Sequence, residues 1–347
     1  MASTFEKVIR VVRRTFKWLS LGLVSFLLLI VLAGLSYRLL MPAPHDPLGK
    51  LINMDGYQLH IVLAGEKSDK PTLVIEGGGG LSTEFYHWLS EDLKDHLRVI
   101  RYDRIGIGQS DALDSPRDPE TVARRLHALL NKAGESPPYI MMGHSTGGPQ
   151  IRVFTELYPD EVQGLFFLDA THPDHVVRYN APKQTSFKYR GYLASIELQA
   201  VLCDLGILPL YDRLFGTPYY GPGLPDTIND RFKECLRNGK AFRGYKEETK
   251  YYYATLERSG QLEDFGDLPI RAFHAVPEDP VERELKREKL QTKIQFGKHK
   301  EYAELSTNGK GIEIPGNHVS IFTERENAAI ICREVIELLE ELAPYKR

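Results

Sequence analysis

Cysteine is scarce in this sequence, and neither basic nor acidic residues dominate it. The 347 residues include three cysteines, and the formal net charge at pH 7 is −3. The cysteines are far apart, with no C-x-x-C pair and no Cys/His group at metal-ligand spacing, so nothing indicates a metal site. No basic segment is interleaved with aromatic residues, which argues against a nucleic-acid partner. We therefore expect neither a metal nor a nucleic acid.

One segment near the N-terminus contains no charge at all. The residues from Leu19 to Tyr37 are mostly apolar, and about 20 such residues span the hydrocarbon core of a membrane. Trp18 and Tyr37 stand at the two ends of this segment, where aromatic side chains favour the membrane interface. Basic residues precede it, at Lys7, Arg10, Arg13, Arg14 and Lys17. This asymmetry predicts a single-pass anchor over about 18–40, with a cytoplasmic N-terminus and an extracytoplasmic remainder.

A cleaved signal peptide is the alternative reading of the same segment. The apolar run is long for a signal peptide and no convincing small-x-small cleavage site follows it, so we expect the anchor to be retained. An extracytoplasmic location permits disulfides. Cys203 and Cys235 are then either a disulfide or two unpaired thiols, and the sequence leaves both open.

The rest of the chain has the pattern of an α/β protein. After the anchor (1–40) and a proline-rich tether (41–50), short apolar strands alternate with amphipathic helices over 51–170, and the alternation resumes over 268–347. This pattern predicts a parallel sheet covered by helices on both faces. The intervening residues 171–267 are helical and loop-like in character and rich in tyrosine, which predicts an inserted lid.

The strongest chemical signal is the G-x-S-x-G motif at 143–147. An apolar strand (139–142) precedes it and a helix (148–158) follows it, which is the context of a nucleophile elbow. The two glycines permit a sharp turn that lifts the hydroxyl of Ser145 clear of the sheet. Ser145 is therefore the candidate nucleophile.

A serine needs a base and an oxyanion site to act as a nucleophile. The last histidine, His318, follows the final predicted strand and precedes the closing helix, so we expect it to be the base. The backbone N–H groups of Thr146 and of Gly78, in the glycine-rich loop 76–80, are the candidate oxyanion donors, with Gly79 as the neighbouring alternative. That loop lacks both G-x-G-x-x-G and G-K-[ST] spacing, so we expect no dinucleotide or nucleotide cofactor.

Together these motifs resemble the α/β-hydrolase fold superfamily, over roughly residues 51–345. The resemblance implies an eight-stranded, mostly parallel sheet with helices on both faces and a helical lid between strands 6 and 7. It also implies that Asp103 and Arg104 belong to a structural turn. Many members have histidine where this chain has Glu76, whose role is left open. The motifs that carry the resemblance are 76–80, 103–110, 143–147 and 316–318.

The acid of the triad is the residue that the sequence leaves divided. Most members of the superfamily place it after the seventh strand, where Glu278 and Asp279 stand, and a minority place it after the sixth, where Asp169 stands. We favour Asp169 over Asp279, with Glu278 third.

These residues predict a membrane-anchored serine hydrolase that cleaves a small-molecule or lipid-like carboxylic ester. An amidase or peptidase and a thioesterase share the same chemistry and remain alternatives. A non-hydrolytic lyase, oxygenase or binding protein on this fold is a further alternative. The natural substrate and the oligomeric state are beyond the sequence.

Overall fold

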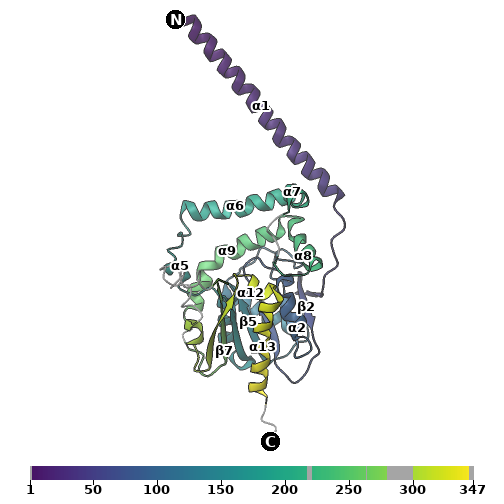
Figure 1. Ribbon diagram of the computed structural model, residues 1–347, viewed down its shortest axis with the longest axis vertical. Coiled ribbons are helices and arrows are strands. Elements are labelled where there is room, and N and C mark those ends of the chain that lie inside the picture. Colours follow the sequence, from purple (N-terminus) through teal and green to yellow (C-terminus); the bar gives the residue numbers. More distant parts are fainter. Residues whose placement is uncertain (1, 217–220, 263, 280–299, 344–347) are drawn as a thin grey trace.

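The most prominent feature of the computed structural model is a long N-terminal helix. The structure describes residues 2–216, 221–262, 264–279 and 300–343. Helix α1 (Ala2–Leu40) projects away from the rest of the molecule (Figure 1). The segment Val8–Leu40 reaches a mean hydropathy of 2.5 and is long and apolar enough to cross a membrane. Its large apolar side chains are mostly exposed, so this helix needs another apolar environment.

An eight-stranded sheet forms the centre of the remaining chain, in the order β1-β2-β4-β3-β5-β6-β7-β8. The β1–β2 and β2–β4 pairs are antiparallel, and the pairs from β4 onward are parallel. The predicted eight-stranded, mostly parallel sheet is therefore confirmed. Its strands are β1 (Lys50–Asn53), β2 (Gln58–Ala64), β3 (Thr72–Glu76), β4 (Val99–Tyr102), β5 (Tyr139–His144), β6 (Val162–Leu168), β7 (Ile270–Val276) and β8 (Gly309–Pro315).

Two hydrophobic clusters lie on opposite faces of this sheet. One includes Leu126 of α3 and Phe154 of α4, and the other includes Leu89 of α2 and Val335 of α13. Central strands such as β3 and β5 are buried throughout because helices cover both of their sides. The elements that flank the sheet are η1 (Thr83–Tyr86), α2 (His87–Leu93), α3 (Pro119–Lys132), α4 (Gly147–Leu157), η2 (Pro159–Glu161), α12 (Ser320–Thr323) and α13 (Arg325–Leu342).

The described residues between β6 and β7 form a group of helices, which we call the cap. Helix α9 contacts both α6 and α4, so it lies between the outer cap helix and the sheet (Figure 1). Most of the described residues of this segment are therefore helical. The cap consists of α5 (His175–Arg178), α6 (Phe187–Asp204), α7 (Ile207–Phe215), α8 (Asp226–Phe232), η3 (Lys233–Leu236) and α9 (Lys240–Ser259).

The proline-rich tether lies against the cap at several points. Arg237 donates to the carbonyl of Pro42 (2.7 Å), and Arg231 donates to the carbonyl of Asp46 (2.6 Å). The imidazole of His45 lies 2.9 Å from a carboxylate oxygen of Glu234. The tether is therefore held along α8 and η3.

Strand β1 and the cysteines are two features that the sequence did not settle. Strand β1 has no counterpart among the predicted strands. It is a half-polar edge strand, exposed at most of its positions, so it carries no buried apolar run. Cys203 and Cys235, left open between a disulfide and two thiols, are both free thiols in the structure.

Candidate active site

Ser145 lies on the sharp turn between β5 and α4. Its φ of +51° is left-handed, a conformation that side-chain-bearing residues rarely adopt and that is characteristic of strained functional positions. The flanking glycines are required by space: a Cβ on Gly143 would lie 2.6 Å from the carbonyl oxygen of Gly147, and one on Gly147 would lie 2.2 Å from that of Glu76. Strand, turn and helix therefore have the form of the predicted elbow.

Asp169 and His318, which are far apart in the chain, meet beside this turn. Asp169 follows β6 with a φ of +39°, and its Oδ2 lies 2.6 Å from Nδ1 of His318. Asp279 and Glu278, the other two candidate acids, are exposed in the segment after β7. Of these carboxylates, Asp169 is the one in hydrogen-bond contact with the ring nitrogen that a triad acid holds.

A second histidine holds the same carboxylate. Nδ1 of His274, on β7, lies 2.8 Å from Oδ1 of Asp169. Burial would raise the pKa of Asp169, but the hydrogen bonds from His274 and His318 outweigh it and hold the pKa well below its usual range. The carboxylate is therefore ionised at neutral pH and fixed at both oxygens. Sequence reasoning missed His274, because a histidine in an apolar strand gives no signal until its neighbours are known.

A chain of hydrogen bonds joins the glycine-rich loop to the backbone of His318. The N–H of Gly78 donates to the Tyr86 hydroxyl (2.8 Å), which lies 3.1 Å from Nδ1 of His144. Nε2 of His144 lies 3.0 Å from the carbonyl oxygen of His318. Burial is the main cause that holds the pKa of His144 well below its usual range, and the nearby His318 lowers it further, so the ring of His144 is neutral. These partners assign the ring proton to Nε2, which donates to the carbonyl, and leave Nδ1 to accept from the tyrosine.

This chain of bonds affects the predicted oxyanion donors. The N–H of Gly78, predicted as a donor, already has the tyrosine hydroxyl as its acceptor. Gly78 and the neighbouring alternative Gly79 both line the cavity that Ser145 and Thr146 line. Gly78 therefore fits a positioning role better than that of an oxyanion donor.

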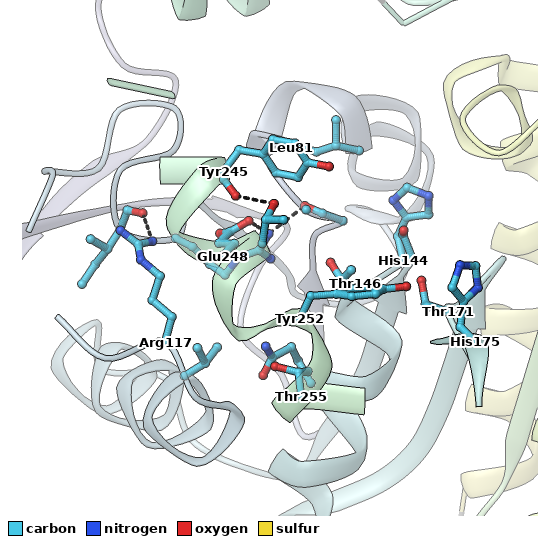
Figure 2. Close-up of a pocket in the computed structure, with 18 of the residues that line it drawn as sticks. Leu81, Arg117, His144, Thr146, Thr171, His175, Tyr245, Glu248, Tyr252 and Thr255 are labelled. Atoms are coloured by element: carbon cyan, nitrogen blue, oxygen red, sulfur yellow. Dashed lines mark hydrogen bonds and ion pairs between the residues drawn. The ribbon is translucent and has the colours of Figure 1, made fainter. Parts of the chain in front are cut away.

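Ser145 opens into a cavity of about 530 Å³ beneath the cap. Figure 2 shows Tyr245, Glu248 and Tyr252 of α9 reaching into it, with His144 and Thr171 on one side and Arg117 on the other. Tyr192 of α6 also lines the cavity, and its hydroxyl lies 2.8 Å from that of Tyr245. The cap tyrosines thus line a cavity wall that also carries threonines and charged groups.

A buried ion network fixes the cap to the glycine-rich loop. Arg104 donates to Glu76 (2.6 Å) and to Glu248 of α9 (2.7 Å), and Glu248 accepts from the N–H of Gly80 (2.9 Å). Burial raises the pKa of Glu76, and the two carboxylates outweigh burial to raise the pKa of Arg104. Glu76, left without a role by the sequence, is therefore a partner of Arg104. Arg104 itself both lines the cavity and joins cap to core.

Asp103, predicted to be structural, is buried and accepts from backbone N–H groups on two sides. These belong to Thr83 (2.8 Å) and Gln109 (2.9 Å), and His60 lies 2.7 Å from the same carboxylate. Across the described part of the chain, no three His, Cys, Asp or Glu side chains are grouped so as to hold a metal ion.

Known proteins resemble this chain in both sequence and fold. Residues 70–191 match a family model described as the alpha/beta hydrolase fold. The chain is 29% identical over 146 residues to YbdG of Bacillus subtilis (strain 168), which covers 42% of this chain and 44% of that protein. It is 31% identical over 116 residues to a proline iminopeptidase of Lactobacillus helveticus, which covers 32% of this chain and 39% of that protein. The chain thus spans less than half the length of these relatives.

A solved structure extends the likeness over most of the chain. The enol-lactonase from Burkholderia xenovorans LB400 superposes with a TM-score of 0.56 at 17% identity, covering 84% of this chain and 100% of that one. At this identity the likeness establishes the fold.

Proposed function

Because this chain belongs to the α/β-hydrolase fold superfamily, we propose that it is a membrane-anchored serine hydrolase that cleaves carboxylic esters. The observation that carries the proposal is the strained Ser145 on its elbow, which lines one cavity with His318 and Asp169. A folded protein keeps a serine at positive φ against a cost of order 1–3 kcal/mol only where surrounding structure enforces it, and such positions cluster at functional sites.

The proposed reaction follows from the positions of these groups. His318, held at Nδ1 by Asp169, takes the proton of Ser145 through its other nitrogen as the hydroxyl attacks the ester carbonyl. The ionised Asp169 holds the imidazole in the required tautomer and stabilises the imidazolium. His318 then protonates the leaving alcohol, and water releases the acyl group from Ser145.

The developing oxyanion needs two N–H donors aimed at one point. We assign these to Thr146, at the start of α4, and to Gly79. Gly79 takes the place of Gly78 because the N–H of Gly78 is bonded to Tyr86. Tyr86 and Gly78 then shape the loop that presents Gly79.

Membrane attachment is the second part of the proposal. Helix α1 would cross the membrane, with the basic N-terminal residues on the cytoplasmic side and the hydrolase domain on the other. The exposed apolar side chains of α1 support this assignment.

The test uses the full chain in detergent, with p-nitrophenyl esters of increasing acyl length. We expect turnover that S145A abolishes, together with covalent labelling by a fluorophosphonate that the same variant loses. A folded protein that neither labels at Ser145 nor turns over any ester would refute the proposal.

A peptidase is the second candidate, because of the similarity to the proline iminopeptidase. Proline p-nitroanilide distinguishes the two activities. Turnover of the anilide at a kcat/KM above that of every ester would replace the esterase by the peptidase.

A further inference from the structure

Two consecutive cap helices present large apolar side chains to the outside. Beyond α1, most of the exposed large apolar residues that the structure describes belong to α6 and α7. Phe187 is 92% exposed, Leu198 57% and Phe215 73%. Exposed apolar side chains gathered on two consecutive helices in this way indicate an interaction site.

The exposed stripe of α6 has helical periodicity and carries no charge. Its members recur every three to four residues, so they share one face, and the opposite face packs on the cap through residues such as Ile196 and Ala200. Helix α6 is thus apolar on both sides, although an ordinary surface helix is polar on its outer side. The stripe consists of Phe187, Gly191, Ala194, Leu198 and Val201.

The charges of α6 are distributed in the same sense. Glu197 faces inward to Arg243 (3.0 Å), and Asp204 faces the same arginine (2.7 Å). By contrast, the basic residues Lys188 and Arg190 are exposed near the start of the helix. The outer surface therefore combines apolar side chains with cations, and its acids are neutralised within the cap.

Helix α1 packs on the corner between these two helices. The corner turns by 81° between α6 and α7, and Gly206 lies there with a φ of +72°. A Cβ on Gly34 of α1 would lie 2.5 Å from the carbonyl oxygen of Leu205, so two backbones touch at this point. Arg38 of α1 also donates to the carbonyl of Asp204 (2.6 Å).

The depth of this contact identifies what covers the apolar surface. Gly34 lies inside the uncharged segment Leu19–Tyr37, not beyond its end. At 1.5 Å of helical rise per residue, it is only about 5 Å short of Tyr37 along the axis. If α1 crosses a membrane, the corner of α6 and α7 is therefore level with the edge of the hydrocarbon layer.

We propose that the outer face of α6 and α7 lies in the interfacial layer of the bilayer that α1 crosses. The apolar stripe then contacts acyl chains, while Lys188 and Arg190 extend to the headgroups. Figure 1 shows α6 running across the end of the molecule from which α1 departs, with α7 at one end of it, as this arrangement requires.

The same face points to where the substrate comes from, and this step rests on the proposed esterase function. Tyr192 of α6 is 45% exposed and also lines the cavity of Ser145. One helix thus borders both the apolar outer surface and the catalytic cavity. The substrate class that fits is an amphiphilic ester that resides in the bilayer and enters past α6.

The position of the helices is tested without any reference to activity. The full chain with W18F and W88F, which removes both of its tryptophans, is reconstituted into vesicles of phosphatidylcholine containing brominated acyl chains, and a single tryptophan is introduced as F215W or L198W. We expect strong quenching of both, relative to L113W, which reports an exposed apolar position on the core. Equal, weak quenching of all three would overturn the membrane position.

The source of the substrate is tested with a paired assay. The double variant L198D/F215D should lose at least tenfold in turnover of a long-chain umbelliferyl ester embedded in vesicles, yet retain turnover of dissolved p-nitrophenyl butyrate. L113D is the matched control and should change neither. Equal turnover of the embedded ester by the double variant and wild type would overturn the inferred source of the substrate. Absence of all turnover in wild type would instead refute the esterase function, and the quenching result would then decide the membrane position of α6 and α7 by itself.

Discussion

Replacement of Asp169 by asparagine should disable the proposed triad with little change in shape. Oδ1 of Asp169 accepts from His274 and Oδ2 from His318. In D169N, His274 holds the amide oxygen, so the amide nitrogen turns toward Nδ1 of His318. An N–H facing that nitrogen forces it to become an acceptor, which places the ring proton on Nε2. His318 then cannot take the proton of Ser145.

The expected loss follows from this change of tautomer together with the loss of charge beside the imidazolium. An asparagine substitution of the triad aspartate in a serine protease lowers kcat by about 10⁴-fold, and we expect roughly 10³- to 10⁴-fold here, or about 4–5.5 kcal/mol in the barrier. The assay is p-nitrophenyl butyrate hydrolysis at pH 8 in the linear range. Its sensitivity limit is set with S145A.

D279N is the matched control for this experiment, since Asp279 is the rival acid and lies exposed. Its activity should remain within about twofold of wild type, because surface substitutions are commonly almost neutral. Circular dichroism and thermal unfolding of both variants establish that they are folded. A folded D169N with more than a tenth of wild-type kcat would refute the reasoning, and an inactive D279N would transfer the role to that residue.

Three further predictions concern groups around the triad. His274 and His318 outweigh burial and depress the pKa of Asp169, so its ionised form stabilises the fold above the unfolded pKa of about 3.9, and this contribution is lost as the pH falls through the folded pKa. The difference in the free energy of unfolding between wild type and D169N, measured in urea, should therefore decrease from pH 5 to pH 2. A constant difference would contradict this prediction. Y86F leaves the N–H of Gly78 and Nδ1 of His144 without partners, at about 1–3 kcal/mol. It should lower Tm and reduce kcat about tenfold, or about 1.4 kcal/mol, with little change in KM; an unchanged kcat would show that this chain of bonds does not position the site. E248Q weakens the charge-assisted bonds to Arg104 by about 1.5–3 kcal/mol, so hydrogen exchange in α9 should accelerate. The neighbouring E247Q loses a surface pair with Lys250 worth less than about 1 kcal/mol and should not accelerate exchange. Equal exchange rates in both variants would show that the network does not hold the cap.

The sheet was predictable because its strands are short apolar runs, whose pattern is set by burial on both faces. Strand β1 escaped for the same reason, since an exposed edge strand needs no apolar run. The elbow was predictable because the residues that form it are consecutive in the sequence. The sequence favoured Asp169 as the partner of His318 but left Asp279 and Glu278 as rivals, because the pairing depends on how the fold brings together two residues 149 positions apart.

The remaining differences arise where a role depends on a neighbour. The N–H of Gly78 has the right position in the loop, but it already donates to the Tyr86 hydroxyl, a contact that the sequence does not reveal. Arg104 sits in a turn that the resemblance marks as structural, yet a glutamate of the cap, 144 residues away, pairs with it. Side chains from an insertion cannot be assigned to partners in the core until the fold brings them together.

The attachment of the tether to the cap determines how far the folded domain can move away from α1. Pro42, His45 and Asp46 are bonded along η3 and α8, so little free chain separates α1 from the domain. A domain on a long flexible linker would sample a hemisphere of solvent and meet substrates from any direction. If α1 crosses a membrane and the chain is an esterase, as proposed, this domain stays at a fixed height above the bilayer and meets a membrane-resident ester by diffusion in two dimensions. The rate of hydrolysis should then follow the mole fraction of ester in the lipid rather than its bulk concentration. Adding inert lipid while the total amount of ester stays constant should therefore lower the rate.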